Sequence, residues 1–546
     1  MSVAEKNFNE LTERFFDWYW KNHPEEATSI GDHRYDQHLS DFSEEGILKR
    51  TQAVQGFLKE LKNIPGDKLP LETRVDYKLL HSMLKKKERE QNELKHYQTK
   101  PESYTASGLG GVYLLVIRNF APLEERMESI RARLKEFPRV LAEGRQRLEN
   151  PPRVFVETEL LSLPGTIGFF SHVLPNLAEK TPALKAEIDQ GCRQVVDALD
   201  QFREFLESIR DDSSGDYAVG ENVFERMLTE DHFLDYNCET LLEKGKELVE
   251  ETQKEMEKIT EQIDPDKRWE EIINDTKKEH PSEEELLDYY RQESEKAKEF
   301  VRQKNLVDLH AGELVIEETP EPFRPIIPYA AYLNPAPLEE EQTGRFFVTP
   351  VDPDKDPAEK EAQLGEHSYY SVPLTVLHEG YPGHHLQLCY ANRASSLLKK
   401  IAHSTLFIEG WAFYCEQLME QQGYLKDPRN RLHRLKDQLW RACRIVADVS
   451  LHTGKMAFDE AVDYMEKVAL LERNSAVTEV RRYTATPTQP MSYLIGKLEI
   501  LKIVEEYRKK KGNDFNLKEF HHALLNYGSL PPELIRELLF SCPKKP

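Results

Sequence analysis

The sequence predicts a mainly α-helical, two-lobed protein with a deep central cleft and a small β-element beside the helix that carries the candidate site. Apolar residues recur at three- and four-residue spacings along most of the chain, as in amphipathic helices. Strand-like runs are confined to residues 312–351. The length of 546 residues exceeds what one hydrophobic core usually supports, so two lobes sharing a cleft are expected.

The helices of the first half follow from this spacing of apolar side chains. In the first of them, over residues 5–21, Phe8, Leu11, Phe15 and Trp18 fall on one face. A capping-box sequence at 281–285 predicts that a later helix begins there and runs to about residue 303. The same spacing predicts helices over 44–64, 72–98, 122–149, 182–210 and 237–263.

The pattern changes at residues 312–351, where short alternating runs between Pro-rich turns predict a small sheet. A helix follows from about residue 372, with Pro373 suited to its first turn and Ser371 to its N-cap. We therefore expect a helical N-terminal lobe over 1–310 and a C-terminal part over 311–546. That part would contain the sheet at 312–351, active-site helices at 372–420, further helices at 430–452, 457–470, 492–511 and 516–526, and an irregular loop at 484–491.

The composition limits the partners and the cellular location. A net charge of −23 argues against a nucleic-acid or anionic-membrane partner, because both would be repelled. The six cysteines are scattered and form no C-x-x-C pair, so neither a disulfide framework nor a structural zinc module is expected. The first residues lack the basic and apolar regions of a signal peptide, which favours the cytoplasm. The oligomeric state is left open.

Side chains that could bind a metal or transfer a proton cluster in one short run, His378-Glu379-Gly-Tyr-Pro-Gly-His384-His385, and Glu409 follows about one helix later. Imidazole nitrogens and carboxylate oxygens are ligands of Zn²⁺, and a catalytic zinc site uses three of them and leaves one position for water. In the common H-E-x-x-H motif the two histidines lie four residues apart on one helical face. Here the fourth residue after His378 is Pro382, which cannot bind a metal.

The second ligand must then be His384 or His385, and a regular helix would place it too far away. Seven residues of helix rise about 10 Å, whereas metal–ligand bonds are about 2 Å long. Proline removes a helical hydrogen bond, and glycine tolerates unusual dihedral angles. A break at Tyr381-Pro382-Gly383 is therefore predicted to bring the later histidine back towards His378.

These residues also carry a resemblance to a known family. The run from His378 to Gln387, followed by Phe407-Ile-Glu409-Gly-Trp-Ala, resembles the bacterial domain of unknown function 885, whose members look related to gluzincin peptidases such as angiotensin-converting enzyme, thimet oligopeptidase and the thermostable carboxypeptidases. The resemblance implies that Glu409 is the third metal ligand. Glu409 follows His384 by 25 residues and His385 by 24, and both spacings fit the family.

The resemblance extends over roughly residues 320–505 and includes Trp440-Arg441-Ala-Cys-Arg444 and the block from Arg481 to Lys497. Because gluzincins use tyrosine hydroxyls from a C-terminal segment to stabilise the oxyanion, it implies Tyr483 or Tyr493 for that role. Arg482 or Lys497 is a candidate partner for a substrate carboxylate.

The other roles follow from the residue types. Glu379, beside the first ligand, is the candidate general base that later becomes the general acid. Glu416 and Asp448 are candidates to orient the ligands, and Glu416 is also an alternative ligand to Glu409.

We therefore expect a zinc metallopeptidase with one Zn²⁺ ion that hydrolyses peptide bonds in small peptides. The alternatives are a metal-dependent amidase that acts on a non-peptide amide and a non-catalytic helical binding protein that contains a metal. Exopeptidase and endopeptidase activity cannot be distinguished from the sequence.

Overall fold

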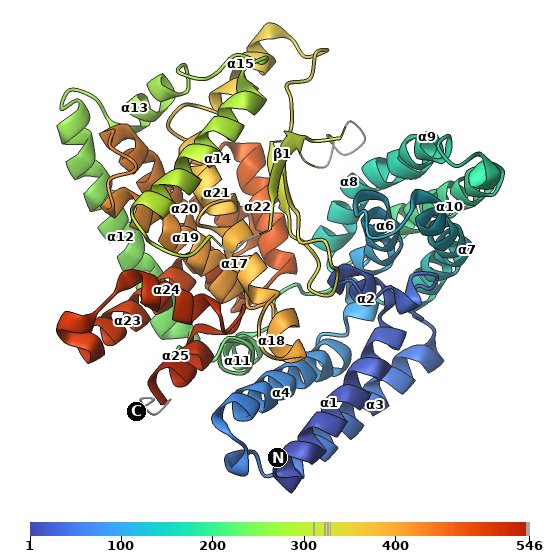
Figure 1. Cartoon of the computed structure of the whole chain (residues 1–546). Helices are drawn as coiled ribbons and strands as arrows, with labels where there is room; N and C mark the ends of the chain where they lie inside the picture. The colour runs from blue at the N-terminus through green and yellow to red at the C-terminus, as the bar shows by residue number, and fades with distance from the viewer. Residues whose placement is uncertain (310–311, 321–323, 325–326, 328, 542–546) are drawn as a thin grey trace. The chain divides into compact units, whose positions relative to one another are not determined.

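The structure is a computed structural model that describes residues 1–309, 312–320, 324, 327, 329–541 of the chain. It is mainly helical with one small sheet, so the prediction of a mainly α-helical protein with a small β-element is confirmed (Figure 1). The chain divides into two compact units. The N-terminal unit comprises Met1–Val219 with Ala336–Glu341, and the C-terminal unit comprises Gly220–Pro335 with Gln342–Pro546.

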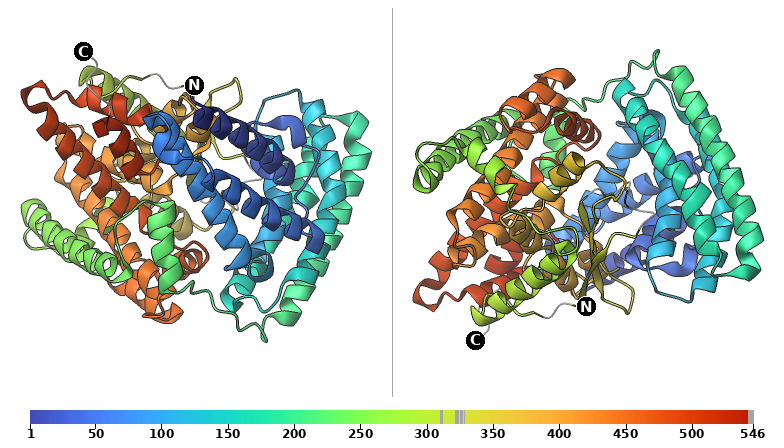
Figure 2. Two further views of the ribbon diagram at one scale, coloured as in Figure 1. Left: turned by 90° about the horizontal axis from the view of Figure 1, so that it is seen from below. Right: turned by 90° about the horizontal axis from the view of Figure 1, so that it is seen from above.

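The N-terminal unit consists of helices. Helices α1, α3, α7 and α10 agree closely with predicted segments, α4 ends at Asn92 and not near residue 98, and α2, α6, α8 and α9 were not predicted. Its two longest helices, α7 and α10, pack side by side (Figure 2). The helices are α1 (Val3–Asn22), α2 (Pro24–Ile30), α3 (Glu44–Lys62), α4 (Leu71–Asn92), α5 (His96–Thr99), α6 (Glu102–Ile117), α7 (Leu123–Arg147), α8 (Arg153–Gly168), α9 (Leu174–Ala178) and α10 (Pro182–Ile209).

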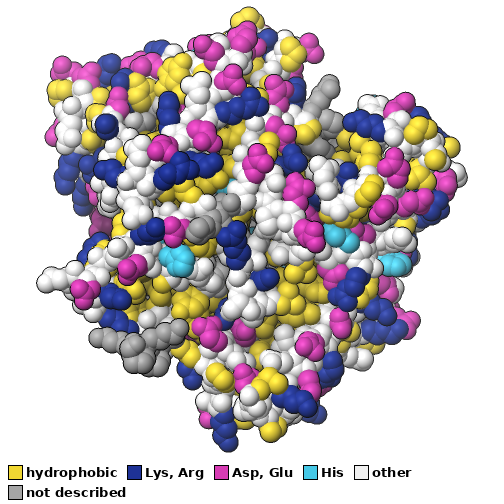
Figure 3. Space-filling view, viewed as in Figure 1, with side chains coloured by type: hydrophobic (Ala, Val, Ile, Leu, Met, Phe, Trp, Pro, Cys, Tyr) yellow, Lys and Arg dark blue, Asp and Glu magenta, His cyan; other side chains and the backbone are white. Residues whose placement is uncertain are grey.

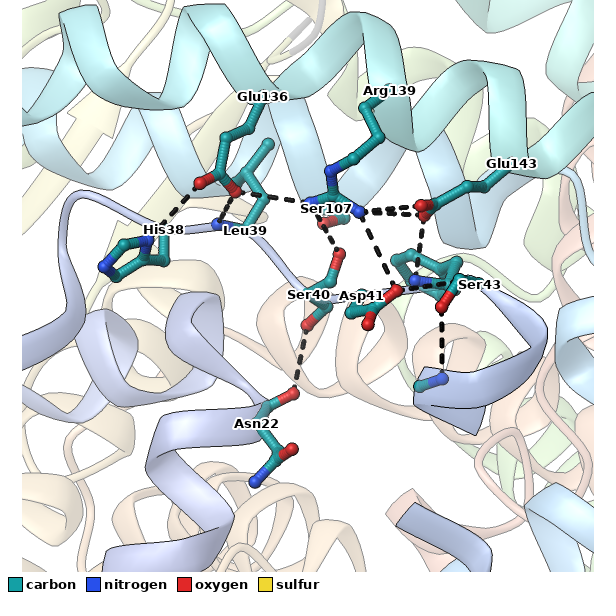
Figure 4. Close-up of polar contacts among 12 residues, drawn as sticks. Asn22, His38, Leu39, Ser40, Asp41, Ser43, Ser107, Glu136, Arg139 and Glu143 are labelled. Carbon is teal, nitrogen blue, oxygen red and sulfur yellow. Dashed lines mark hydrogen bonds and ion pairs between the residues drawn. The ribbon is translucent and has the colours of Figure 1, made fainter. Parts of the chain in front are cut away.

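The connection between α2 and α3 is held by charged side chains of α7. Glu136 accepts a hydrogen bond from the backbone N–H of Leu39 at 2.9 Å, and Glu143 accepts one from Phe42 at 2.9 Å. Arg139 lies between the two carboxylates and binds Glu143 at 2.9 Å (Figure 4). These ionic groups satisfy backbone donors that no helix or strand would satisfy.

The C-terminal unit contains the remaining helices and the sheet. Its α12 packs along α20, and α14 packs against α16 and the first strand. The helices are α11 (Glu221–Arg226), α12 (Cys238–Ile263), α13 (Trp269–Thr276), α14 (Leu286–Gln303), α15 (Pro357–Gly365), α16 (Val372–Glu379), α17 (His384–Ala391), α18 (Leu397–Ile401), α19 (Thr405–Gln421), α20 (Pro428–His452), α21 (Phe458–Lys467), α22 (Arg473–Ala485), α23 (Ser492–Lys511), α24 (Leu517–Leu525) and α25 (Pro532–Ser541).

The division between the units differs from the boundary expected near residue 310. It lies at Val219/Gly220, because α11 to α14 pack on helices of the site-bearing unit. Helical periodicity shows that a segment has an apolar face but not which other segment covers that face.

The small sheet has the strand order β1-β3-β2, with β1 (Leu314–Glu318), β2 (Ala330–Leu333) and β3 (Gly344–Val348). Strand β3 is central, parallel to β1 and antiparallel to β2. Phe346 of β3 is fully buried and packs edge-on against Tyr290 of α14, with ring centroids 5.7 Å apart. The sheet therefore lies against the helix layer that also contacts α16.

Two predicted helix starts have different outcomes. At α14 the predicted capping box is present, because Ser282 and Glu285 exchange side-chain to backbone hydrogen bonds of 3.3 Å, although the regular helix begins at Leu286. At α16 the prediction of a Ser371 side-chain cap is wrong. The Ser371 hydroxyl instead donates to the carbonyl of Glu366 at 2.9 Å.

Acidic and basic side chains are interspersed on the face shown in Figure 3, with hydrophobic side chains between them. None of the helices formed by the described residues combines the length and the apolar character needed to cross a bilayer. Cys192, Cys238, Cys389, Cys415 and Cys443 are free and buried, whereas Cys542 lies outside the described residues.

Candidate metal centre

The predicted interruption between the two histidine-bearing helices is confirmed. Helix α16 ends at Glu379 and α17 begins at His384. A Cβ at Gly383 would lie 1.9 Å from the carbonyl oxygen of His378, so only glycine allows the chain to pass this close to the end of α16. Trp411 of α19 secures the connection by donating to the carbonyl of Pro382 at 2.9 Å.

The break brings His378 and His384 together, with ring centroids 4.6 Å apart. Both rings face Glu409 of α19. The Glu409 Oε2 atom lies 3.6 Å from Nε2 of His378 and 3.5 Å from Nε2 of His384. Ligand atoms bound at 2.0–2.2 Å to a tetrahedral Zn²⁺ would be about 3.3–3.6 Å apart. The two distances from Glu409 therefore suit a shared zinc ion.

Glu416, one of the predicted orienting residues, contacts the other side of the first imidazole. Its Oε1 lies 2.8 Å from Nδ1 of His378, and its side chain is only 2% exposed. A carboxylate in this position holds the proton on Nδ1 and leaves the Nε2 lone pair directed towards Glu409. Glu416 therefore takes the orienting position and not the position of a ligand.

The charges of these groups are strongly coupled. Burial acts to lower the pKa of His378, but hydrogen bonds with Glu409 and Glu416 outweigh this effect and raise the pKa to about 10. Burial acts to raise the pKa of Glu409, yet hydrogen bonds from His378 and His384 hold it well below its usual range. A divalent cation would take the place of the proton that this group of side chains otherwise shares.

Glu379 lies beside the same imidazole pair. One ligand atom each from His378, Glu379 and His384 can be chosen so that all three lie within 4.8 Å of one another. Nδ1 of His384 is buried without a hydrogen-bond partner among the described residues. Two carboxylates, Glu379 and Glu409, thus face two imidazoles. Glu409 makes the shorter printed contacts, 3.6 and 3.5 Å to the two Nε2 atoms, and Glu379 lies within 4.8 Å of both imidazoles.

His385, the alternative second ligand, is directed away from this centre. Its Nε2 lies 3.0 Å from the carbonyl oxygen of Gly312, which can only accept, so Nε2 carries the proton. Nδ1 must then accept a hydrogen bond from the Tyr332 hydroxyl at 3.1 Å. Burial lowers the pKa of His385 to about 4. With both nitrogens engaged, His385 links α17 to the sheet, and His384 is the histidine that faces Glu409.

Of the two candidate tyrosines, Tyr483 is fully buried and its hydroxyl is fully engaged. The hydroxyl donates to Glu479 at 2.7 Å and accepts from Arg444 Nε at 3.0 Å and Trp440 Nε1 at 3.3 Å. A hydroxyl has one hydrogen to donate and two lone pairs. The capacity of Tyr483 is therefore used within this network.

Tyr493 is the candidate tyrosine near the ligands. Its helix, α23, packs closely along α19, which carries Glu409. Burial raises the pKa of Tyr493, and the negative charge of Glu409 raises it further. The side-chain amide of Gln489 donates to the Tyr493 hydroxyl at 3.4 Å, while its carbonyl oxygen accepts from Arg482 at 2.6 Å. Arg482 thus fixes the orientation of the amide. Among the described residues, the Tyr493 hydroxyl has no hydrogen-bond acceptor.

The remaining predicted residues are engaged elsewhere in the protein. Lys497 is 2% exposed and donates to Gln438 at 2.8 Å, and burial, together with the nearby Arg434 cation, holds its pKa well below the usual range. Asp448 is fully buried and accepts from the backbone N–H groups of Thr488 and Met491, so it caps the loop before α23 and does not orient a ligand.

Two features near the centre were not predicted to be functional. No motif or residue spacing in the sequence points to Tyr332, because its contact with His385 depends on the sheet register. Arg441 and Arg444 surround the Tyr493 ring at 5.5 and 4.8 Å. Both arginines lie in the block from Trp440 to Arg444 that resembles the family, and this resemblance could have identified them.

Comparisons with other proteins agree with the whole-chain fold. The chain is similar to a structure from Shewanella oneidensis described as a "putative lipoprotein of unknown function", with a TM-score of 0.82, 28% identity, and coverage of 97% of this chain and 99% of that chain. It also has the fold of a "putative lipoprotein" from Colwellia psychrerythraea, with a TM-score of 0.82, 18% identity, and coverage of 98% of both chains. No curated protein matches it. A family model described as "Bacterial protein of unknown function (DUF885)" matches residues 24–539, and the chain therefore belongs to this family.

Proposed function

We propose that this protein is a zinc-dependent peptidase that hydrolyses peptide bonds in small peptides. One observation carries the proposal: a carboxylate oxygen of Glu409 lies 3.6 and 3.5 Å from the Nε2 atoms of His378 and His384, with Glu379 beside them. His378, His384 and Glu409 would hold one Zn²⁺ ion. When bound, the ion would acidify a water molecule and polarise the substrate carbonyl.

Glu379 performs the proton transfers. It is the last residue of α16, next in sequence to His378, and its carboxylate is directed to the same space as the imidazoles. In this position it takes a proton from the attacking water and transfers that proton to the leaving nitrogen. A structural zinc site does not need such a carboxylate, so its presence favours catalysis over a purely structural metal.

Tyr493 stabilises the developing oxyanion. Its hydroxyl accepts from Gln489, and its own hydrogen is therefore available to donate to the substrate oxygen. The orientation of Gln489 is fixed by Arg482, which donates to its side-chain carbonyl oxygen at 2.6 Å. Tyr483 has no equivalent hydrogen to offer, because Glu479 accepts it.

The resemblance to gluzincins supports the same assignment, because that family combines two histidines, a later glutamate and a C-terminal tyrosine. The proposal includes a cytoplasmic location for the protein. Fractionation of native cells, followed by detection of the protein in the soluble cytoplasmic fraction or with membranes, tests this inference.

The test of the proposed activity uses the full chain loaded with Zn²⁺ and a mixture of short peptides analysed by mass spectrometry. We expect cleavage that a chelator abolishes and that added Zn²⁺ restores. Glu379→Gln should keep its zinc but lose at least about 10²-fold in rate. The matched control is Glu257→Gln, which makes the same chemical change at an exposed position of α12.

Each outcome separates the candidate functions. Absence of any chelator-sensitive peptide cleavage would contradict the peptidase. Turnover confined to non-peptide amides would favour the amidase, which needs the same ligands and the same base. Stoichiometric zinc without turnover of any amide would favour the non-catalytic binding protein.

A further inference from the structure

An arginine pair on α20 has no role in the proposed chemistry and lies against the aromatic side chains of the site. The guanidinium of Arg441 lies 4.9 Å from the Phe413 ring centroid and 5.5 Å from that of Tyr493. The guanidinium of Arg444 lies 4.8 Å from the Tyr493 ring. Two cations therefore contact the ring whose hydroxyl is the candidate oxyanion donor.

The rings that the arginines contact lie on the helices α19 and α23, and α19 also carries the candidate ligand Glu409. Phe413 follows Glu409 by one turn of α19, so the two side chains share a helical face. Tyr493 reaches the same region from α23, which packs along α19. Arg441 contacts both Phe413 and Tyr493. Arg441 therefore contacts the residue one turn after Glu409 on α19 and also the candidate oxyanion donor on α23.

The charges around Tyr493 do not balance. Arg444 and Arg482 both bind the Glu479 carboxylate, each at 2.9 Å, so one anion serves two cations. The acid next to Arg441 is Asp437, whose carboxylate is 3.9 Å away and 31% exposed. Glu409 is the third acid near Tyr493, and the proposed metal would hold it. Among the described residues, two acids would then remain for three arginines, an excess of positive charge that would attract an anionic group.

The hydrogen bonds of Arg441 are also incomplete. Its Nη1 donates to the backbone carbonyl of Asp437 at 3.1 Å. Its Nε is buried and has no hydrogen-bond partner among the described residues. Its side chain is 12% exposed. A buried donor of this kind is rarely left unsatisfied, and a carboxylate is the group that matches the planar guanidinium best.

We propose that Arg441, supported by Arg444, binds the free C-terminal carboxylate of a peptide whose scissile bond lies at the His378, His384 and Glu409 centre. The inference rests on the proposed peptidase function and narrows its substrates to peptides with an unblocked C-terminus. Residues in an extended chain span about 3.5 Å each. A carboxylate one or two residues beyond the cleaved bond would therefore reach a subsite next to Tyr493.

The experiment compares one peptide mixture in two forms, with free C-terminal carboxylates and with C-terminal amides. The first measurement is capture of each form by full-length Glu379→Gln protein, which binds without turnover. We expect the free acids to be captured about tenfold or more in excess of the amides, as loss of a charge-assisted hydrogen bond predicts. In the Glu379→Gln, Arg441→Gln double variant this ratio should approach one.

Arg473→Gln is the matched control, because Arg473 on α22 is 48% exposed and pairs only with surface acids in the described structure. It should retain the preference for free acids. Arg441→Lys keeps the charge but loses the planar fork, and it should retain only part of the preference. This second variant keeps the test decisive if Arg441→Gln does not fold, as judged by zinc content and thermal unfolding.

The second measurement compares hydrolysis of both mixtures by the wild-type protein and by the Arg441→Gln variant. Loss of rate on the free acids with an unchanged rate on the amides supports the inference. Equal capture of the two forms, or a preference that survives in both Arg441 variants, would overturn it. If the wild type cleaves neither mixture, the peptidase proposal fails. The ratio of captured free acids to captured amides then still shows whether Arg441 binds a C-terminal carboxylate.

Discussion

Gly410 of α19 and Gly496 of α23 meet with almost no space between their backbones. A Cβ on Gly410 would lie 2.4 Å from the carbonyl carbon of Gly496, and one on Gly496 would lie 1.9 Å from the carbonyl oxygen of Leu406. Glu409 directly precedes the first glycine, and Tyr493 lies one turn before the second. The close approach of the two helices therefore places the third candidate ligand beside the candidate oxyanion donor.

Gly496→Ala should separate these helices. We expect a loss of about 1–3 kcal/mol in the free energy of unfolding, as for other overpacked cores, together with weaker zinc retention. Urea unfolding and metal analysis measure the two effects. Gly56→Ala, in α3, is the control, because nothing lies within 4 Å of its Cβ, and it should be neutral or slightly stabilising. Equal stability of Gly496→Ala and wild type would contradict the packing described.

The two adjacent histidines should behave differently in metal binding. His384→Ala removes a candidate ligand and should lower zinc content strongly. His385→Ala should keep most of the zinc but lose about 1–3 kcal/mol of stability, because it leaves Tyr332 and the Gly312 carbonyl without their partner. Metal analysis after dialysis and thermal unfolding distinguish the two effects. A greater zinc loss in His385→Ala would reverse the assignment.

Removing the hydroxyl of Tyr493 should affect catalysis, whereas removing that of Tyr483 should affect stability. Tyr493→Phe should lower kcat by about 10²–10³-fold with little change in KM, because its donor acts on charge that develops in the transition state. Tyr483→Phe should mainly reduce stability, because Arg444, Glu479 and Trp440 lose a shared partner. Steady-state kinetics and urea unfolding of both variants test this. A rate loss confined to Tyr483→Phe would exchange their roles.

Glu159 of α8 should make stability depend on pH. Burial raises the pKa of this carboxyl to about 7. Because the folded pKa lies above the unfolded value, its contribution to stability is fully present below about pH 4.5 and is lost as the pH rises through 7. Glu159→Gln should therefore stabilise the protein by roughly 3 kcal/mol at pH 8.5 and have little effect at pH 4. Urea unfolding at both pH values tests this, with the exposed Glu207→Gln as control. A gain of the same size at both pH values would exclude ionisation as the cause.

Much of the fold could be predicted from local patterns. Helices such as α1 and α10 begin and end within about two residues of the predicted bounds, because their apolar spacing is long and regular. The three strands also appear where alternating runs predict them. The unit boundary could not be predicted in this way, because α12 shows its apolar face in the sequence but not its partner, α20.

The candidate site shows the same limit. The helix break follows from Pro382 and Gly383, since both disfavour a continuous helix. The choice between His384 and His385 depends on the direction in which α17 leaves the break, which sequence spacing does not determine. Arg441 was missed because its missing partners can be recognised only once its neighbours in space are known.

The segment Ala336–Glu341 makes the N-terminal unit discontinuous in sequence. The backbone N–H of Leu338 donates to the carbonyl of Ile30 at 2.9 Å, and Arg118 lies 3.7 Å from Glu339, so the segment is bonded within that unit. The polypeptide therefore crosses between the units after residues 219, 335 and 341. A fragment that ends at Val219 would lack part of its own fold, and a protease that cuts there would leave two covalent connections intact. Genetic dissection of this protein into two independent halves would need residues 336–341 to be relinked to the N-terminal unit, and a simple truncation would not achieve this.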